Sequence, residues 1–171
     1  MIRLSSAVSS GFSFSGISRG YELKLDDQVV GTLERASFWS CNYVATTQEG
    51  SWRFRRGGFF NTGAEIVDSA SQQTIATLKA GWGGKGELTF SDGQKFLLGA
   101  RGWWRPVWSV TTESGEPVLE LRTREKLVEV PNATAVAARR LSLLAMFTLY
   151  RMRQAEEDAA SAAMVGVIAA S

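Results

Sequence analysis

The chain has 171 residues, of which 44% are hydrophobic and 21% are charged, and its formal net charge is +2. It contains no histidine and one cysteine, which excludes Ser-His-Asp and Cys-His nucleophile pairs, histidine-containing zinc sites and a disulfide framework. A charge so near balance makes a nucleic-acid partner unlikely on electrostatic grounds. The length favours a single domain over residues 1–171.

The amino-terminal residues 1–20 contain many Ser and Gly and lack the apolar core of a signal peptide. No apolar run reaches the length of about 18 residues that a membrane-spanning helix requires. The lone Cys41 has no histidine to activate it and fits a reducing compartment, so we expect a small buried hydrophobic side chain there. These features predict a cytoplasmic protein without a transmembrane segment.

Residues 21–130 repeat one pattern, in which a strand of alternating apolar residues is followed by a polar turn and another strand. In the clearest hairpin, Asp92 and Gly93 separate strands at 87–90 and 95–98 and are expected to supply the positive φ angles of a tight turn. Further hairpins are predicted at 107–111 with 117–121, 21–25 with 29–33, and 64–67 with 75–78. The strand at 51–56 alternates aromatic residues, expected to point inward, with arginines.

Strong helix formers without Gly or Pro fill residues 133–158. The central residues 141–152 are apolar on nearly every face, which indicates burial on all sides, and at about 18 Å they are too short to span a bilayer. A sheet closed around this helix satisfies both observations. The sequence therefore predicts a mainly β fold, a closed antiparallel β-barrel of hairpins (about 1–130) around a buried C-terminal helix.

The helix ends are also informative. The flanking Arg139, Arg140, Arg151 and Arg153 are expected at the two mouths of the barrel. The Ala-rich tail at 159–171 is interpreted as a short docked helix or a frayed end. The acidic residues 156–158 would be unfavourable at a helix C-terminus, which hints that the helix runs on into this tail.

Turns with an acidic residue and glycine at 91–94 and 113–116, followed by the apolar segment 141–152, resemble the tubby C-terminal-like superfamily. That superfamily includes tubby, the phospholipid scramblases and the LURP-one-related proteins, and the resemblance covers about residues 20–155. It implies a twelve-stranded barrel around a central helix and, by analogy with tubby, phosphoinositide binding. No individual binding residue of tubby can be matched to a position here, and the Cys- or Pro-rich amino-terminal region and the acidic calcium loop of scramblases are missing.

Two arginine- and tryptophan-rich segments are the candidate binding sites. We expect their arginines to bind anionic headgroups, because guanidinium groups fork onto phosphate oxygens and Trp favours membrane interfaces. The nominated residues are Arg53, Arg55, Arg56, Arg101 and Arg105.

The expected function is that of a non-enzymatic barrel that binds anionic phospholipid or a membrane surface, with no cofactor and no metal. In the alternative interpretation the aromatics fill the barrel wall and the arginines are solvated or paired with Glu. The barrel would then bind a protein partner or a small ligand without a membrane role, with ligand capacity at a mouth near Arg139, Arg140 or Arg151.

Overall fold

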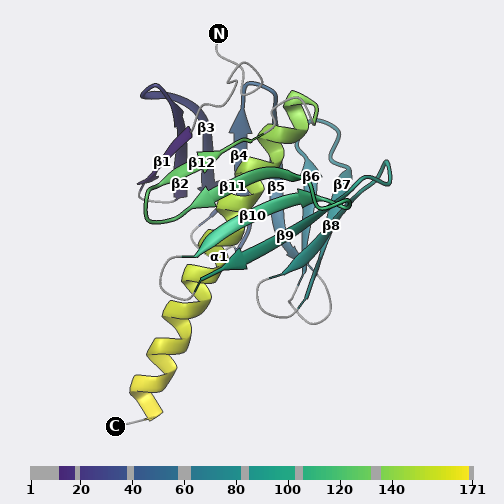
Figure 1. The fold of residues 1–171 in the computed structure, drawn as a ribbon. Helices are drawn as coiled ribbons and strands as arrows, with labels where there is room; N and C mark the ends of the chain where they lie inside the picture. The colour runs from purple at the N-terminus through teal and green to yellow at the C-terminus, as the bar shows by residue number, and fades with distance from the viewer. Residues whose placement is uncertain are drawn as a thin grey trace.

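The computed structural model describes residues 12–17, 20–37, 41–57, 63–81, 85–102, 106–131 and 136–169, with side chains described as far as Met164. Within these residues every strand pairs antiparallel with the next along the chain, and the last pairs with the first, so the sheet closes into a barrel (Figure 1). The elements are β1 (Phe12–Ile17), β2 (Gly20–Leu25), β3 (Gln28–Arg35), β4 (Tyr43–Thr47), β5 (Gly50–Gly57), β6 (Gly63–Asp68), β7 (Thr74–Ala80), β8 (Gly86–Phe90), β9 (Lys95–Arg101), β10 (Val107–Thr112), β11 (Pro117–Arg122), β12 (Leu127–Glu129) and α1 (Ala138–Ala169).

The predicted hairpins are confirmed, and their apolar positions face the interior. On β5, Trp52 and Phe54 are fully buried, whereas Arg53 and Arg55, which alternate with them, are half-buried on the opposite face. This alternation follows from the twofold side-chain period of a strand. In a closed sheet, one face therefore lines the apolar interior and the other faces solvent.

Two hairpin turns show how the sequence sets the connections. Asp26 and Asp27 both have positive φ (48° and 63°), as a two-residue turn between paired Leu25 and Gln28 requires. In the β8–β9 turn only Gly93 has positive φ, at 86°. The expectation that Asp92 shares this conformation is wrong, because the longer loop closes through a bond from the Phe90 N–H to the Gln94 carbonyl.

The buried helix is confirmed as the core of the barrel. Residues 141–150 of α1 are all buried, and Phe147 packs edge to face on Phe54 with ring centroids 5.3 Å apart. Tyr150 contacts Tyr43 in the same way at 5.6 Å. Gly31 on β3 allows close approach of the helix, since a Cβ there would lie 2.9 Å from the Met146 sulfur. An apolar helix surface on every side is therefore matched by inward side chains from around the barrel.

The helix bounds differ from the prediction at both ends. α1 begins at Ala138 instead of residue 133, where its first turn can meet the acid side chains of the barrel mouth. It continues to Ala169 instead of ending at 158, because the Ala-rich segment contains no proline and favours helix. Residues 159–169 thus form neither a separate docked helix nor a frayed end, and the continuation of the helix that the acidic residues 156–158 indicated is confirmed. No helix among the described residues is long and apolar enough to cross a membrane.

Candidate functional site: the two mouths of the barrel

The closed antiparallel topology assigns each connection between strands to one of two mouths. The β2–β3, β4–β5, β6–β7, β8–β9 and β10–β11 turns share a mouth with the start of α1. The β1–β2, β3–β4, β5–β6, β7–β8, β9–β10 and β11–β12 connections share the other mouth, through which α1 leaves the barrel (Figure 1).

The mouth at the start of α1 is acidic, and we call it the acidic mouth. Its five strand-to-strand turns contain no lysine or arginine. Arg139 and Arg140, in the first turn of α1, supply positive charge there and form ion pairs with Asp68 and Asp92, the latter at 2.8 Å. The carboxylates on these turns are Asp26, Asp27, Glu49, Asp92, Glu113 and Glu116.

Asp68, the last residue of β6, holds the acidic mouth together. Its Oδ1 accepts hydrogen bonds from the backbone N–H groups of Ala70 and Ser71 at 3.0 and 2.9 Å, and its Oδ2 accepts from Arg139. The backbone bond from Ser71 is the largest of the interactions that lower the pKa of this carboxyl group below its ordinary value. Asp68 is therefore ionised and serves as the anchor for the start of α1.

A pocket of about 330 Å³ opens beside this anchor. Its walls combine aromatic and aliphatic side chains with the Arg140 guanidinium, which lies 4.0 Å above the Phe90 ring centroid. Trp52 also lines the pocket and is fully buried, and its Nε1–H has no hydrogen-bond partner among the residues that the structure describes. The lining residues are Trp52, Ile75, Phe90, Asp92, Gln94, Ala137, Arg139, Arg140 and Leu143.

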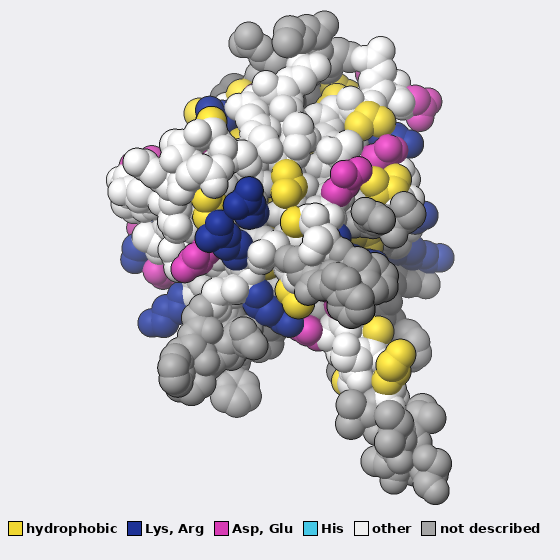
Figure 2. Space-filling view, turned by 180° about the vertical axis from the view of Figure 1, so that it is seen from behind, with side chains coloured by type: hydrophobic (Ala, Val, Ile, Leu, Met, Phe, Trp, Pro, Cys, Tyr) yellow, Lys and Arg dark blue, Asp and Glu magenta, His cyan; other side chains and the backbone are white. Residues whose placement is uncertain are grey.

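The opposite mouth is basic, and we call it the basic mouth. Lysines and arginines lie on its connections and on the last residues of the strands that reach it; Lys79, Lys85, Arg101, Arg124 and Lys126 are exposed. In the view of Figure 2 most dark blue side chains lie across the middle and lower barrel, toward the end from which α1 projects, with magenta side chains among them and a few dark blue ones near the upper end. The basic rim is Arg35, Arg56, Lys79, Lys85, Arg101, Arg122, Arg124 and Lys126.

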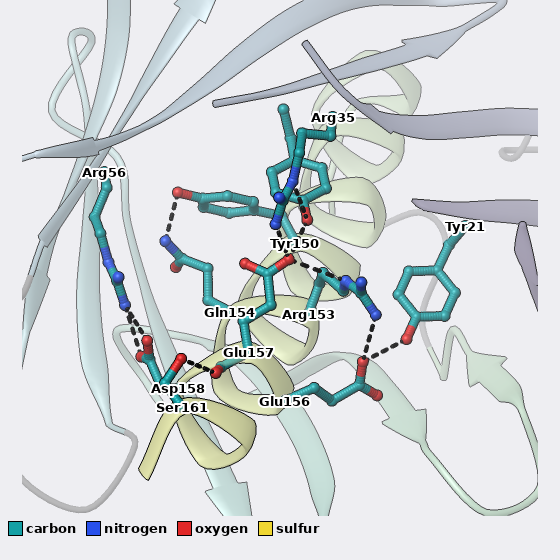
Figure 3. Close-up of polar contacts among 11 residues, drawn as sticks. Tyr21, Arg35, Arg56, Tyr150, Arg153, Gln154, Glu156, Glu157, Asp158 and Ser161 are labelled. Atoms are coloured by element: carbon teal, nitrogen blue, oxygen red, sulfur yellow. Dashed lines mark hydrogen bonds and ion pairs between the residues drawn. The ribbon is translucent and has the colours of Figure 1, made fainter. Parts of the chain in front are cut away.

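Three consecutive acids of α1 lie where the helix passes through this rim (Figure 3), and we call Glu156, Glu157 and Asp158 the acidic triplet. Glu157 forms an ion pair with Arg35 and accepts a 2.6 Å hydrogen bond from the Tyr43 hydroxyl. The triplet thus ties the helix to the inner edge of the barrel and fixes the direction in which it leaves.

The other two acids of the triplet bind different strands. Glu156 accepts a 2.7 Å hydrogen bond from the Tyr21 hydroxyl on β2. Burial, reinforced by this bond, raises the pKa of Tyr21 to about 12. Asp158 accepts bonds of 2.7 and 2.6 Å on its two oxygens from Arg56 on β5. The triplet therefore contacts β2, β3, β4 and β5.

The five nominated arginines do not converge. Arg53 and Arg55 lie on the outward face of β5, whereas Arg56, one residue further, lies on the inward face and pairs with Asp158. Arg101 lies four strands away from β5, on β9, and pairs with Glu120 at 3.0 Å. Arg105 lies outside the described residues. Only Arg56 and Arg101 of the described four belong to the basic rim.

Sequence reasoning missed most of the rim. Lys79, Lys85, Arg124 and Lys126 are scattered along the chain, and none belongs to an arginine-rich cluster with tryptophan. A usable signal was nevertheless present, because alternate connections of an antiparallel barrel reach the same mouth. The acids of the β2–β3, β4–β5, β8–β9 and β10–β11 turns fall at one mouth, and Lys85, Arg124 and Lys126 fall on connections at the other. The paired Arg35, Tyr21 and Tyr43 were also missed, since their partners lie more than 100 residues away along the chain.

Cys41 is exposed in the β3–β4 connection, so the expectation of a buried side chain is wrong. A side chain on a connection between strands does not reach the core, whereas an inward-facing side chain on a strand does. In the described part of the chain no cluster of three or more Cys, Asp or Glu side chains is arranged to hold a metal ion.

Comparison of the chain with protein-family models, with curated proteins and with solved structures found no match. The resemblance to the tubby-like superfamily therefore stays a prediction.

Proposed function

We propose that this protein is a non-enzymatic module that binds the surface of an anionic phospholipid membrane through the basic mouth. The observation that carries the proposal is the separation of charge between the two mouths. A small net charge of +2 conceals acidic turns at one end and the basic rim at the other. Such a field orients the basic end toward an anionic leaflet and repels the acidic end.

The rim has charge available for headgroups. Lys79, Lys85, Arg124 and Lys126 are exposed and form no ion pair with another described residue. In contrast, Arg35 and Arg56 are committed to the acidic triplet, so they position the helix instead of binding lipid. Headgroup binding is also the function that the predicted tubby-like resemblance implies.

Co-sedimentation with vesicles tests this function. The wild-type protein should bind phosphatidylcholine vesicles that contain phosphatidylserine and not pure phosphatidylcholine vesicles, and binding should weaken as salt rises from about 0.1 to about 0.5 M. The rim variant K79Q/K85Q/R124Q/K126Q should bind roughly two to three orders of magnitude more weakly, because each basic residue near an anionic surface contributes about 1 kcal/mol.

A matched variant distinguishes the rim from the outer wall. R53Q/R55Q removes two arginines on the outward face of β5 that form no ion pair with another described residue, and it should retain nearly wild-type affinity. If R53Q/R55Q lost binding and the rim variant bound fully, the lipid site would lie on the outward face of β5 and not at the basic rim. Absence of wild-type binding to either vesicle would refute the lipid function.

The pocket at the acidic mouth favours a second candidate function, the binding of a small organic ligand. A volume of about 330 Å³ lies within the range of ligand sites, and the buried Trp52 Nε1–H is a donor without an acceptor. A ligand with a hydrogen-bond acceptor and an apolar body would fit these walls.

Mass spectrometry tests this candidate. The protein as purified should release a bound small molecule under denaturing conditions, and Trp52→Phe, which keeps a ring but removes the donor, should carry less of it. A protein mass without adduct under native conditions, from both wild type and variant, would count against this function.

A further inference from the structure

The last turns of α1 leave the barrel altogether. We call residues 159–169 the helix extension; they continue α1 without interruption and project beyond the strands at the C-terminal end (Figure 1). The segment contains no charged residue. Its described side chains at 159–164 are all exposed, and Met164 is 71% exposed.

This composition is unusual for a helix in water. A solvated helix normally has charged residues on its outer face, whereas an all-round apolar helix needs burial. The buried half of α1 follows that rule inside the barrel. In the extension the described side chains are all exposed, so their apolar surface lacks the cover that residues 141–150 receive.

The place where the extension emerges indicates what covers it. The helix passes through the basic mouth, and the acidic triplet fixes it there by pairing with Arg35 and Arg56. The base of the apolar helix end is thus the acidic triplet, paired with Arg35, Arg56 and Arg153, and the exposed lysines and arginines lie on the strand connections of the same mouth. Apolar surface flanked by positive charge is the combination that binds the boundary between anionic headgroups and acyl chains.

The length agrees with insertion into one side of a bilayer. At a rise of 1.5 Å per residue the extension is about 16 Å long, roughly half of the hydrocarbon thickness.

We propose that the helix extension inserts into the acyl region of the anionic bilayer that the basic rim faces. This insertion rests on the proposed lipid binding and adds to it an apolar contact that salt does not screen. The bound barrel then stands with its acidic mouth directed away from the membrane.

An environment-sensitive fluorophore tests the insertion directly. In a Cys41→Ser background the label is placed at Met164→Cys, or at Glu113→Cys on the acidic mouth as a matched exposed control. On phosphatidylserine-containing vesicles the label at position 164 should shift to the blue and be quenched by lipids brominated on the acyl chain. The label at 113 should show neither change.

Affinity measurements separate insertion from electrostatic binding. Met164→Asn should weaken vesicle binding at least about tenfold, because it removes one large apolar contact, and should leave the salt dependence unchanged. Met164→Leu, which conserves the apolar surface, should bind like the wild type. The rim variant, in contrast, should reduce the salt dependence.

The outcomes distinguish the two proposals. Salt-sensitive binding with an aqueous label at 164 and no effect of Met164→Asn would overturn insertion and leave rim binding intact. No binding to either vesicle would overturn both. Dimerisation of the wild type in solution that Met164→Asn abolishes would show that a second copy covers the extension, and would also overturn insertion.

Discussion

Asp68 illustrates how one side chain connects the barrel to its central helix. Its carboxylate caps the β6–β7 turn through the Ala70 and Ser71 N–H groups and also binds Arg139 at the start of α1. Because its pKa is lowered in the folded protein, it stabilises the fold above the ordinary pKa of about 4. That stabilisation is lost as the pH falls through the lowered value.

Asp68→Asn should therefore lower the free energy of unfolding by about 1–2 kcal/mol at neutral pH, and the difference from wild type should shrink below about pH 4. Urea denaturation at the two pH values measures this. Asp27→Asn, which changes an exposed turn carboxylate with the same positive φ that Asn tolerates, should have little effect at either pH. If Asp68→Asn lowered the free energy of unfolding equally at acidic pH, the loss of stability would not be due to the charge of Asp68.

The three tyrosines of the chain provide a second pH prediction at this scale. Burial raises the pKa of all three hydroxyls, and hydrogen bonds to Glu156 and Glu157 add to the effect at Tyr21 and Tyr43. The neutral form is the one that the fold favours, so this contribution is complete below about pH 10 and is lost as the pH rises through the folded pKa values, about 12 for Tyr21.

Ultraviolet titration of the folded protein should therefore show little tyrosinate absorbance at about pH 10, where the tyrosines of the protein unfolded in guanidinium are already about half ionised. Tyr21 should ionise only near pH 12 or with alkaline unfolding, and Tyr43 and Tyr150 should likewise ionise above their ordinary pKa. Half-ionised tyrosines at pH 10, in protein whose circular dichroism is still native, would contradict the hydrogen bonds at the basic mouth.

At the scale of elements, α1 combines two environments in one continuous helix. Phe147 is fully buried against Phe54, while Met164, on the same helix, is largely exposed. The same chemical change should therefore have opposite consequences at the two positions.

Phe147→Asp should abolish folding, because it places an unpaired charge in the barrel interior. Met164→Asp should fold like the wild type. Circular dichroism and size-exclusion chromatography of the two variants measure the contrast. Phe147→Leu, expected to fold with a loss of about 1 kcal/mol, controls for loss of the ring. A soluble, native-like Phe147→Asp variant would mean that the helix can leave the barrel.

The β5 strand shows which parts of the fold could be predicted from sequence. Alternation at Trp52 and Phe54 identified the inward face, and the all-round apolarity of 141–152 identified a helix that needed enclosure. Both are local periodic patterns. The same alternation places Arg56 on the inward face with Trp52 and Phe54, although the sequence interpretation grouped it with Arg53 and Arg55.

The basic mouth depends on relations that no local pattern contains. Arg56 and Asp158 are 102 residues apart, and their pairing requires the helix to be threaded through a closed sheet. Only the order of the strands shows that four exposed cations lie at one mouth, namely Lys79, Lys85, Arg124 and Lys126. The inference about the helix extension likewise depends on the end of the barrel at which the extension emerges.

At the scale of the whole molecule, the two ends of the barrel differ in charge. Carboxylates lie on the turns around the start of α1, and the basic rim lies at the mouth where the helix leaves. The helix therefore runs from the acidic mouth to the basic mouth. A membrane that binds this molecule should therefore contact one end and not its side.

Hydrogen exchange of the protein bound to phosphatidylserine-containing vesicles, compared with the free protein, tests this orientation most directly. Backbone amides at the basic mouth, around 85–86, 101–102 and 123–126, and those of residues 159–169 should become protected on binding. The acidic turns at 26–27, 92–93 and 113–116 should exchange at unchanged rates. Protection of these acidic turns, or of the outer face of β5 alone, would contradict membrane binding through the basic mouth.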